Sequence, residues 1–298
     1  MKGGRSPRRD AAQRPEARPS GLGLVLTCEH ASNQVPARYR HALAGAAGLP
    51  HTHRASDAGA LELARRLARG TGAPLIAGQA TRLLIDLNRS EDQAELWSPW
   101  SAALPEPERQ RLLERLHRPF RAATRAAIDA QLHAQRHTKI GTQLHSQLGT
   151  QLHSQLGTQP STQLDAQLEA HPSPGARRAV LHLSVHSFTP VRRGQRRDMH
   201  VAFLFDPARP LEAELARRWR RALARLEPRL RIAFNRPYRG TDDGHTTALR
   251  RRYPPSRYAG LELEINQLFP RRGGPRWQRL QAHLLASLTV ALPGPPRR

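Results

Sequence analysis

The sequence predicts an α/β fold built around a mostly parallel sheet. Apolar runs of strand length alternate along the chain with segments whose apolar residues recur every three or four positions. Several of these runs are apolar almost throughout, which is typical of strands covered on both faces. Because alternating strands and amphipathic helices form βαβ units, we expect an α/β sandwich with helices packed on the sheet.

The first half of the chain predicts a βαβ unit over residues 22–89. GLGLVLTCEH has the character of a buried strand, and APLIAGQATRLLIDLNR predicts further strand. Between them, DAGALELARRLARGTG begins at Asp57, places its apolar residues on one helical face and ends in two glycines. Leucines, Phe120 and Ala123 at helical spacing then predict a helix over residues 106–136.

The second half repeats the alternation. RRAVLHLSVHSFTP, MHVAFLFD, LRIAFN and YAGLELEINQLF predict strands, whereas PLEAELARRWRRALARLEP and PRWQRLQAHLLASLTVAL predict helices. We therefore expect one domain over residues 22–292.

Two segments fall outside this pattern. Residues 1–21 are basic and lack the apolar centre of a signal peptide, so we expect a disordered tail. Residues 137–175 are of low complexity, and the octapeptide GTQLHSQL occurs at 141–148 and again at 149–156. Repetition accounts for the histidines there without a metal-binding role, so we expect a solvated insertion.

The charge pattern argues against a nucleic-acid partner. The formal net charge is +24, which would attract phosphate backbones. Nearly all of the positive charge is arginine, and these arginines are spread along the predicted helices. The chain is also rich in Ala, Pro and Gly, and a GC-rich coding bias produces such a composition without a nucleic-acid partner. A basic nucleic-acid-associated protein without a working metal nevertheless stays as the alternative from another class.

The cellular setting follows from three absences in the sequence. Apolar runs stay well short of the roughly 20 residues that span a membrane. Cys28 is the single cysteine, which excludes an internal disulfide and a cysteine-rich zinc site. Together with the lack of a signal peptide, these features favour a cytoplasmic protein.

Polar side chains gather where the predicted strands end. They are His30, Asn33, Arg82, Asn88, Arg89, His186 and Glu264. In an open α/β sheet, sites form beyond the carboxyl ends of the strands, so the fold would bring these residues into one crevice. Two histidines and one carboxylate are the usual protein ligands of a catalytic zinc ion, and His30, Asp57 and His186 fit that pattern.

The remaining polar groups fit a hydrolytic site. Glu264 would act as general base on a water molecule. Arginines alongside would suit a substrate that carries a carboxylate. Each residue also has a structural interpretation, because strand-end histidines are often part of the core, Asp57 could cap a helix, and Arg82 and Arg89 could be surface charges.

These motifs resemble the N-formylglutamate amidohydrolase family, particularly a branch of predicted members. The matching segments are CEHASNQVP, SDAGALELARRLA, TRLLIDLNR, SVHSFTP, NRPYRGTDDGHTTALRRR and LELEINQ, in the family's order over residues 22–292. The layout is also similar to that of zinc-dependent N-acetylmuramoyl-L-alanine amidases and, more remotely, zinc carboxypeptidases. The resemblance implies a three-layer α/β sandwich of the zinc-peptidase type with a mixed, mostly parallel sheet.

By this resemblance His30, Asp57 and His186 become Zn2+ ligands and Glu264 the catalytic base. Carboxypeptidase-like relatives have an acidic ligand three residues after the first histidine, so Asn33 is an alternative to Asp57 as the third ligand. Asp57 is preferred because an amide oxygen binds zinc less well than a carboxylate. Otherwise Asn33 and Glu29 would orient the ligands or contact substrate.

The resemblance further implies a small N-acylated amino acid as substrate. Arg82, Asn88 and Arg89 become candidates for binding its carboxylates, and His117 and His245 are further polar contacts. Hydrolysis of N-formyl-L-glutamate to formate and glutamate, a step in histidine breakdown, is the leading expectation. Relatives read EIRQD where this chain has EINQL, so Asn266 and Leu268 leave another N-acylated amino acid open, and a peptidoglycan-type substrate would require export.

Overall fold

The computed structural model of the chain describes residues 22–46, 48–49, 52–133 and 179–292. The predicted basic tail and repeat insertion lie outside these residues. In the described part, no helix combines the length and the apolar character that crossing a membrane requires.

A mixed sheet of six strands forms the centre of the described residues, in the order β2-β1-β3-β8-β6-β7. β2, β1, β3 and β8 run parallel, whereas β6 is antiparallel to β8 and parallel to β7. The mostly parallel sheet predicted from the sequence is therefore confirmed. The strands are β1 (Leu22–Cys28), β2 (Leu75–Ala77), β3 (Ala179–Phe188), β6 (Val201–Leu204), β7 (Ile232–Phe234) and β8 (Tyr258–Asn266).

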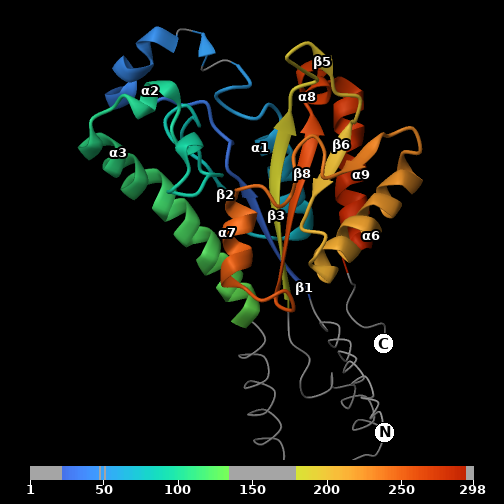
Figure 1. The fold of residues 1–298 in the computed structure, drawn as a ribbon. Helices are drawn as coiled ribbons and strands as arrows, with labels where there is room; N and C mark the ends of the chain where they lie inside the picture. Colours follow the sequence, from blue (N-terminus) through green and yellow to red (C-terminus); the bar gives the residue numbers. More distant parts are fainter. Residues whose placement is uncertain (1–21, 47, 50–51, 134–178, 293–298) are drawn as a thin grey trace, which may run out of the picture.

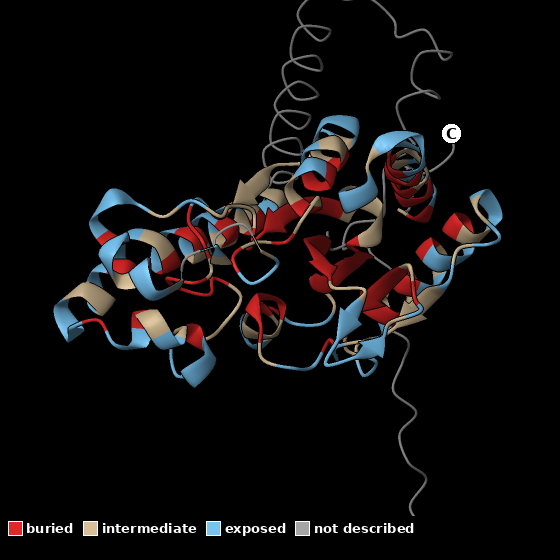
Figure 2. Cartoon of the chain, turned by 90° about the horizontal axis from the view of Figure 1, so that it is seen from above, coloured by how far each residue is buried: buried red, intermediate tan, exposed pale blue. Residues whose placement is uncertain are grey.

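Helices cover both faces of this sheet and make a three-layer sandwich (Figure 1). α1 (Ala60–Thr71), α6 (Pro210–Leu226) and α9 (Gly274–Ala291) bury their apolar sides against one face. α7 (His245–Arg252) packs on the other face together with the helical residues 118–133, which continue from α3 (Glu106–Leu112) through a π-helical turn at Leu113–His117. Seen from above in Figure 2, the buried residues concentrate in the central strands, and the helices turn their exposed sides outward.

Alternation along the strands decides which side chains reach the site. In β1, Leu24 and Leu26 pack toward α1, α6 and α9, whereas Val25 belongs to the cluster on the opposite face. β3 alternates in the same way, with Leu183 and Val185 on the α1 side. Because successive side chains of a strand point to opposite faces, His182, Ser184 and His186 share the face covered by α7.

One strand prediction is wrong over most of its length. Only Leu75–Ala77 of the predicted strand 73–89 pairs with the sheet, and residues 78–89 form turns. The chain leaves the sheet at Gly78, where an added Cβ would lie 2.2 Å from the Glu29 carbonyl oxygen. The apolar residues that suggested a strand are buried instead in a second cluster beside the sheet, with Leu83, Leu84, Ile85 and Leu87.

Short elements complete the described residues. The second cluster is enclosed by η1 (Ala37–Tyr39), η2 (His41–Ala46), η4 (Ala94–Leu96) and α2 (Pro99–Ala102). A small hairpin, β4 (Val191–Arg192) and β5 (Gln195–Arg196), follows β3, and α8 (Leu268–Arg272) follows β8. Both of these additions lie beyond the carboxyl ends of their strands, whereas Ala179 opens β3 at the opposite edge of the sheet.

Gly59, which precedes α1, provides a test of how closely the start of the helix packs against Pro270. It has φ = 76°, and an added Cβ would lie 2.3 Å from Cβ of Pro270. Gly72, at the other end of α1, has φ = 70° with no atom near its added Cβ. Both Gly→Ala changes cost about 1 kcal/mol for the left-handed backbone, but only Gly59→Ala also overpacks, by about 1–3 kcal/mol.

We therefore expect urea unfolding to show Gly59→Ala as clearly less stable than Gly72→Ala. Equal losses of stability in the two variants would contradict the close packing of α1 against Pro270.

Candidate functional site

Two histidines and an aspartate converge at the carboxyl ends of β1 and β3. One potential ligand atom from each of His30, Asp57 and His186 lies within 4.8 Å of the others, and all three side chains are buried. Oδ2 of Asp57 is 3.0 Å from Nδ1 of His186 and 3.4 Å from Nδ1 of His30. The three residues that the sequence predicted to lie together are therefore neighbours in the structure.

The backbone brings these groups together from distant parts of the chain. His30 lies two residues after β1, and its carbonyl oxygen accepts a hydrogen bond from the Asp57 N–H at 3.0 Å. His186 lies near the end of β3, and the next residue, Ser187, donates its N–H to Oδ2 of Asp57 at 3.2 Å. Asp57 is therefore fixed by both strand ends, and the N-cap position of α1 is occupied by Gly59 and not by Asp57.

A second carboxylate lies behind each histidine. Nε2 of His30 is 2.6 Å from Oδ1 of Asp86, and Nε2 of His186 is 3.3 Å from Oε2 of Glu29. Ser184 lies between the last two, donating to Glu29 at 2.6 Å with its hydroxyl 2.8 Å from His186. With the far nitrogens occupied, both histidines present Nδ1 to the same point, an arrangement typical of metal-binding histidines.

The buried carboxylates keep their charge because cationic groups face them. Burial alone would raise the pKa of Asp57, but the imidazoles of His30 and His186 lower it far below its ordinary value. Burial would also raise the pKa of Asp86, and Arg82 together with His30 lowers it. Conversely, burial would lower the pKa of His186, but Asp57 and Glu29 raise it well above its usual range. The carboxylates therefore favour a positive charge at this point, either a protonated imidazole or a bound cation.

Glu264 lies on the neighbouring strand with little compensation for its burial. Parallel pairing of β3 and β8 sets Glu264 directly beside His186. Burial raises the pKa of Glu264 to about 8, and its Oε2 has no hydrogen-bond partner among the described residues. A buried oxygen of this kind is costly unless a ligand or water molecule satisfies it, so Glu264 is available for proton transfer.

A cavity of about 530 Å³ opens from the site toward solvent. Asp57, Asp86 and Arg82 line its inner end. Arg82 binds Oδ2 of Asp86 through Nη2 at 2.5 Å and leaves 30% of its side chain exposed. Arg82 can therefore contact an anionic ligand in this cavity while it is held beside the two aspartates.

The other predicted substrate contacts do not line this cavity. Oδ1 of Asn88 accepts the His245 N–H at 2.7 Å, where α7 begins. Arg89 donates from Nη1 to the carbonyl oxygen of Asp243, so its guanidinium connects two loops. Asn33 is half-buried on the segment after β1 and is likewise absent from the lining of the cavity.

The two further histidines are buried on the α7 side of the sheet. His117, in the π-helical turn, has Nε2 2.8 Å from the carbonyl oxygen of Arg89. His245 opens α7, with Nδ1 3.3 Å from Oε1 of Glu29 and its ring 5.5 Å from those of Phe120 and His182. Burial lowers the pKa of both imidazoles. His245 is therefore a neutral neighbour of Glu29, whereas His117 lies beside the Arg89 carbonyl group and Glu91.

His182 completes this buried polar network. Its Nε2 is 2.8 Å from the Thr27 hydroxyl, and its Nδ1 is 2.8 Å from the Tyr258 hydroxyl. Thr27 in turn donates to Oε1 of Glu29 at 2.8 Å. Burial, and then the neighbouring His245, lower the pKa of His182 to about 3, so it stays neutral behind the site.

Sequence reasoning missed several residues of the site. Asp86 lies inside the apolar stretch LLIDLN. An acidic residue within such a stretch could have indicated a buried functional carboxylate. Gln267 lines the cavity and donates to the Ser187 hydroxyl at 3.1 Å. Arg192, Arg193 and Tyr238 also line it. The two arginines come from a hairpin without a motif, and Tyr238 lies in the segment NRPYRGTDDGHTTALRRR, where the resemblance assigned it no role.

Comparison with known proteins points to one family. The family model described as N-formylglutamate amidohydrolase matches residues 22–171, about half of the chain. No curated protein matched the chain.

Two solved structures share the fold. A gene product of Agrobacterium tumefaciens has 23% sequence identity and a TM-score of 0.62, covering 91% of this chain and 90% of its own. An N-formylglutamate amidohydrolase from Ralstonia eutropha JMP134 has 19% identity and a TM-score of 0.53, covering 92% and 95%. At these identities the two structures support the three-layer fold.

The His182 network predicts a specific pH dependence of stability. A histidine whose pKa is about 3 when folded and about 6.5 when unfolded takes up its proton only in the unfolded chain between these values. Its contribution to stability is therefore present above pH 6.5 and is lost as the pH falls. His182→Gln removes this dependence, so the stability difference from wild type should shrink by up to about 1.4 kcal/mol per pH unit below pH 6.

Urea unfolding at pH 7, 6 and 5 measures this difference, with the exposed His41→Gln as the control. A difference between wild type and His182→Gln that stays constant across this range would show that His182 is not held neutral.

Proposed function

The chain belongs to the N-formylglutamate amidohydrolase family, and from this premise we propose that it is a zinc-dependent hydrolase of N-acylated amino acids. The observation that carries the proposal is the convergence of two imidazole nitrogens and a carboxylate beside the unpartnered oxygen of Glu264. N-formyl-L-glutamate, yielding formate and L-glutamate, is the substrate to test first.

The residues present suit a zinc ion. His30, Asp57 and His186 offer the two nitrogen donors and one oxygen donor found in catalytic zinc sites, which keep a further position open. Asp86 and Glu29 stand behind the histidines, as such ligands require. Zinc bound there would supply a lowered pKa for a water molecule and polarisation of the amide carbonyl.

Glu264 would move the proton during hydrolysis. Its carboxylate would accept a proton from the water that attacks the acyl carbon, and would pass that proton to the nitrogen as the C–N bond breaks. The buried surroundings that raise the pKa of Glu264 help it to hold the proton between these steps. A cation beside it would favour the ionised form that begins the reaction.

Arg82 would orient the substrate. It is the arginine at the inner end of the cavity beside Asp57, and a guanidinium binds a carboxylate through two parallel hydrogen bonds. Asn88 and Arg89, which the sequence predicted for this task, hold the His245 and Asp243 backbones instead. We therefore assign carboxylate binding to Arg82 and give Asn88 and Arg89 a positioning role.

The first test combines metal analysis with replacement of the base. Wild-type protein purified without chelator should hold one zinc per chain and release formate from N-formyl-L-glutamate only while zinc is bound. Glu264→Gln should keep the zinc and lose at least about 100-fold in kcat/KM, because general acid–base catalysis contributes 10²–10⁴-fold. Glu106→Gln, which removes an exposed carboxylate on α3, is the control.

Activity of Glu264→Gln within tenfold of wild type would refute its role as base. Zinc binding without formate release would redirect the search to other acyl groups. A protein that binds no zinc even after its addition would overturn the metal-dependent mechanism.

A second test addresses the support behind the ligands. Asp86→Asn removes the negative charge that holds Nε2 of His30, so zinc affinity should fall about 10- to 100-fold. Competition with a chelator measures this affinity, and circular dichroism checks that the variant is folded. Asp86→Asn with wild-type affinity would show that His30 does not depend on this contact.

A further inference from the structure

A second cavity of about 600 Å³ adjoins the one that leads to the site. Arg192 and Arg193, in the hairpin formed by β4 and β5, line both cavities. The outer wall comes from the rest of the hairpin and from Arg236 and Pro237 on the loop after β7. The cavity that reaches Asp57 and Arg82 therefore continues past the hairpin into this second space, which we call the hairpin cavity.

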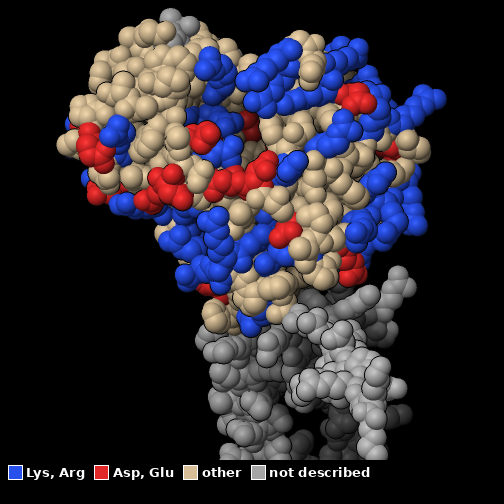
Figure 3. All heavy atoms as spheres, in the orientation of Figure 1, with Lys and Arg blue, Asp and Glu red and all other residues tan. Residues whose placement is uncertain are grey.

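The hairpin cavity has an unbalanced positive charge. Five of its lining residues are arginines, Arg192, Arg193, Arg196, Arg197 and Arg236, and only Asp198 is acidic. Elsewhere in the described residues arginines pair with carboxylates, as Arg38 does with Glu108, but none of these five forms such a pair there. Figure 3 shows arginines gathered at the upper right of the molecule, where Figure 1 labels β5 and α8.

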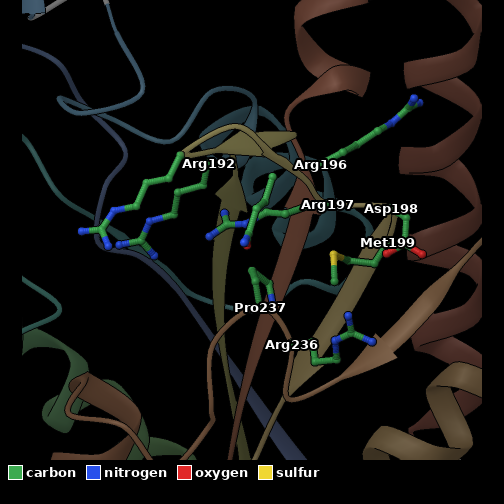
Figure 4. A pocket seen from close by; sticks show the side chains of 9 residues that line it. Arg192, Arg196, Arg197, Asp198, Met199, Arg236 and Pro237 are labelled. Atoms are coloured by element: carbon green, nitrogen blue, oxygen red, sulfur yellow. The ribbon is translucent and has the colours of Figure 1, made fainter.

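The hairpin turns tightly and carries arginines on its two strands and its turn, and the arginine that follows it is held in place. Arg193 and Gly194 both have positive φ, 49° and 76°, between the paired residues Arg192 and Gln195, which is the pattern of a tight type I′ turn. Arg197 is held by Tyr238, whose ring centroid lies 5.3 Å from the guanidinium carbon. Figure 4 shows Arg192 and Arg196 extending in different directions from the hairpin, with Arg236 across from them.

We propose that the hairpin cavity is a second anion-binding subsite, so that the preferred substrates are N-acyl amino acids with an anionic extension. This inference rests on the proposed amidohydrolase function and adds the substrate class. Guanidinium groups without carboxylate partners bind carboxylates or phosphates at little cost, because no existing ion pair has to be broken. Two adjoining cavities of this size also exceed what N-formyl-L-glutamate needs, since several hundred Å³ accommodates a drug-sized ligand.

Pairs of substrates that differ by one charge test the proposal. N-formyl-L-Glu-L-Glu is compared with N-formyl-L-Glu-L-Gln, so that the extra carboxylate lies on the amino acid side of the scissile amide. N-glutaryl-L-glutamate is compared with N-pentanoyl-L-glutamate, so that the extra carboxylate lies on the acyl group. In at least one pair the anionic member should have a kcat/KM about fivefold or more above its neutral partner, and this preference should weaken with added salt.

Two variants locate the preference in the hairpin cavity. Arg193→Asn removes a charge and keeps the turn, because Asn-Gly is the favoured sequence for type I′. Arg236→Gln removes a charge from the opposite wall. Either change should lower the charge preference by about half or more, whereas Arg217→Gln, on the exposed side of α6, should leave it intact.

A binding measurement separates this inference from the proposed function. Calorimetric titration of zinc-loaded protein with tri-L-glutamate should give weaker binding to Arg193→Asn and Arg236→Gln than to Arg217→Gln. If the protein hydrolyses none of the acyl substrates but this difference holds, the subsite stands and the proposed function falls. If hydrolysis occurs without charge preference and the variants bind tri-L-glutamate like wild type, the subsite is overturned and the hydrolase remains.

Discussion

The parallel pairing of β1, β3 and β8 is the constraint on which the site depends. Parallel strands end at the same edge of a sheet, so residues far apart in the chain arrive there together. His186 and Glu264 are direct neighbours through the β3–β8 register, and His30 follows the end of the adjoining strand β1. A shift of one residue in this register would turn His186 or Glu264 toward the apolar core under α1.

The loops add what the strands alone do not provide. Asp57 reaches the site because its own N–H binds the His30 carbonyl group and its carboxylate accepts the Ser187 N–H. Asp86 arrives on the turns that follow Gly78, supported by the cluster around Leu84 and Ile85. The charges then stabilise one another, since Glu29, Asp57 and Asp86 each have a histidine or arginine close by, whereas Oε2 of Glu264 has no hydrogen-bond partner among the described residues. Glu264 is therefore the carboxylate that is free to take part in proton transfer.

Prediction from sequence worked for the position of residues that the strand pattern determines. Strand-end histidines and the glutamate of LELEIN were identified because an apolar strand has few reasons to end in such groups. It failed where tertiary packing decides the outcome. LLIDLN has the apolar content of a strand, but its leucines pack in a separate cluster, and Asp86 was overlooked within it. For Asn88 and Arg89, which the resemblance assigned to substrate binding, the partners in the structure are backbone groups that no local pattern could have named.

The start of β3 bears on how freely the length of the repeat-bearing segment can change. Ala179 and His186 stand at opposite ends of one extended strand, about 23 Å apart at the usual rise per residue. The repeat-bearing segment joins the described fold at Ala179, at the edge remote from the reaction. Changes in its length therefore enter the described fold at a point far from the reactive groups. Selection on turnover has little reason to act at that point, so length can drift there while the carboxyl ends of the strands stay constant.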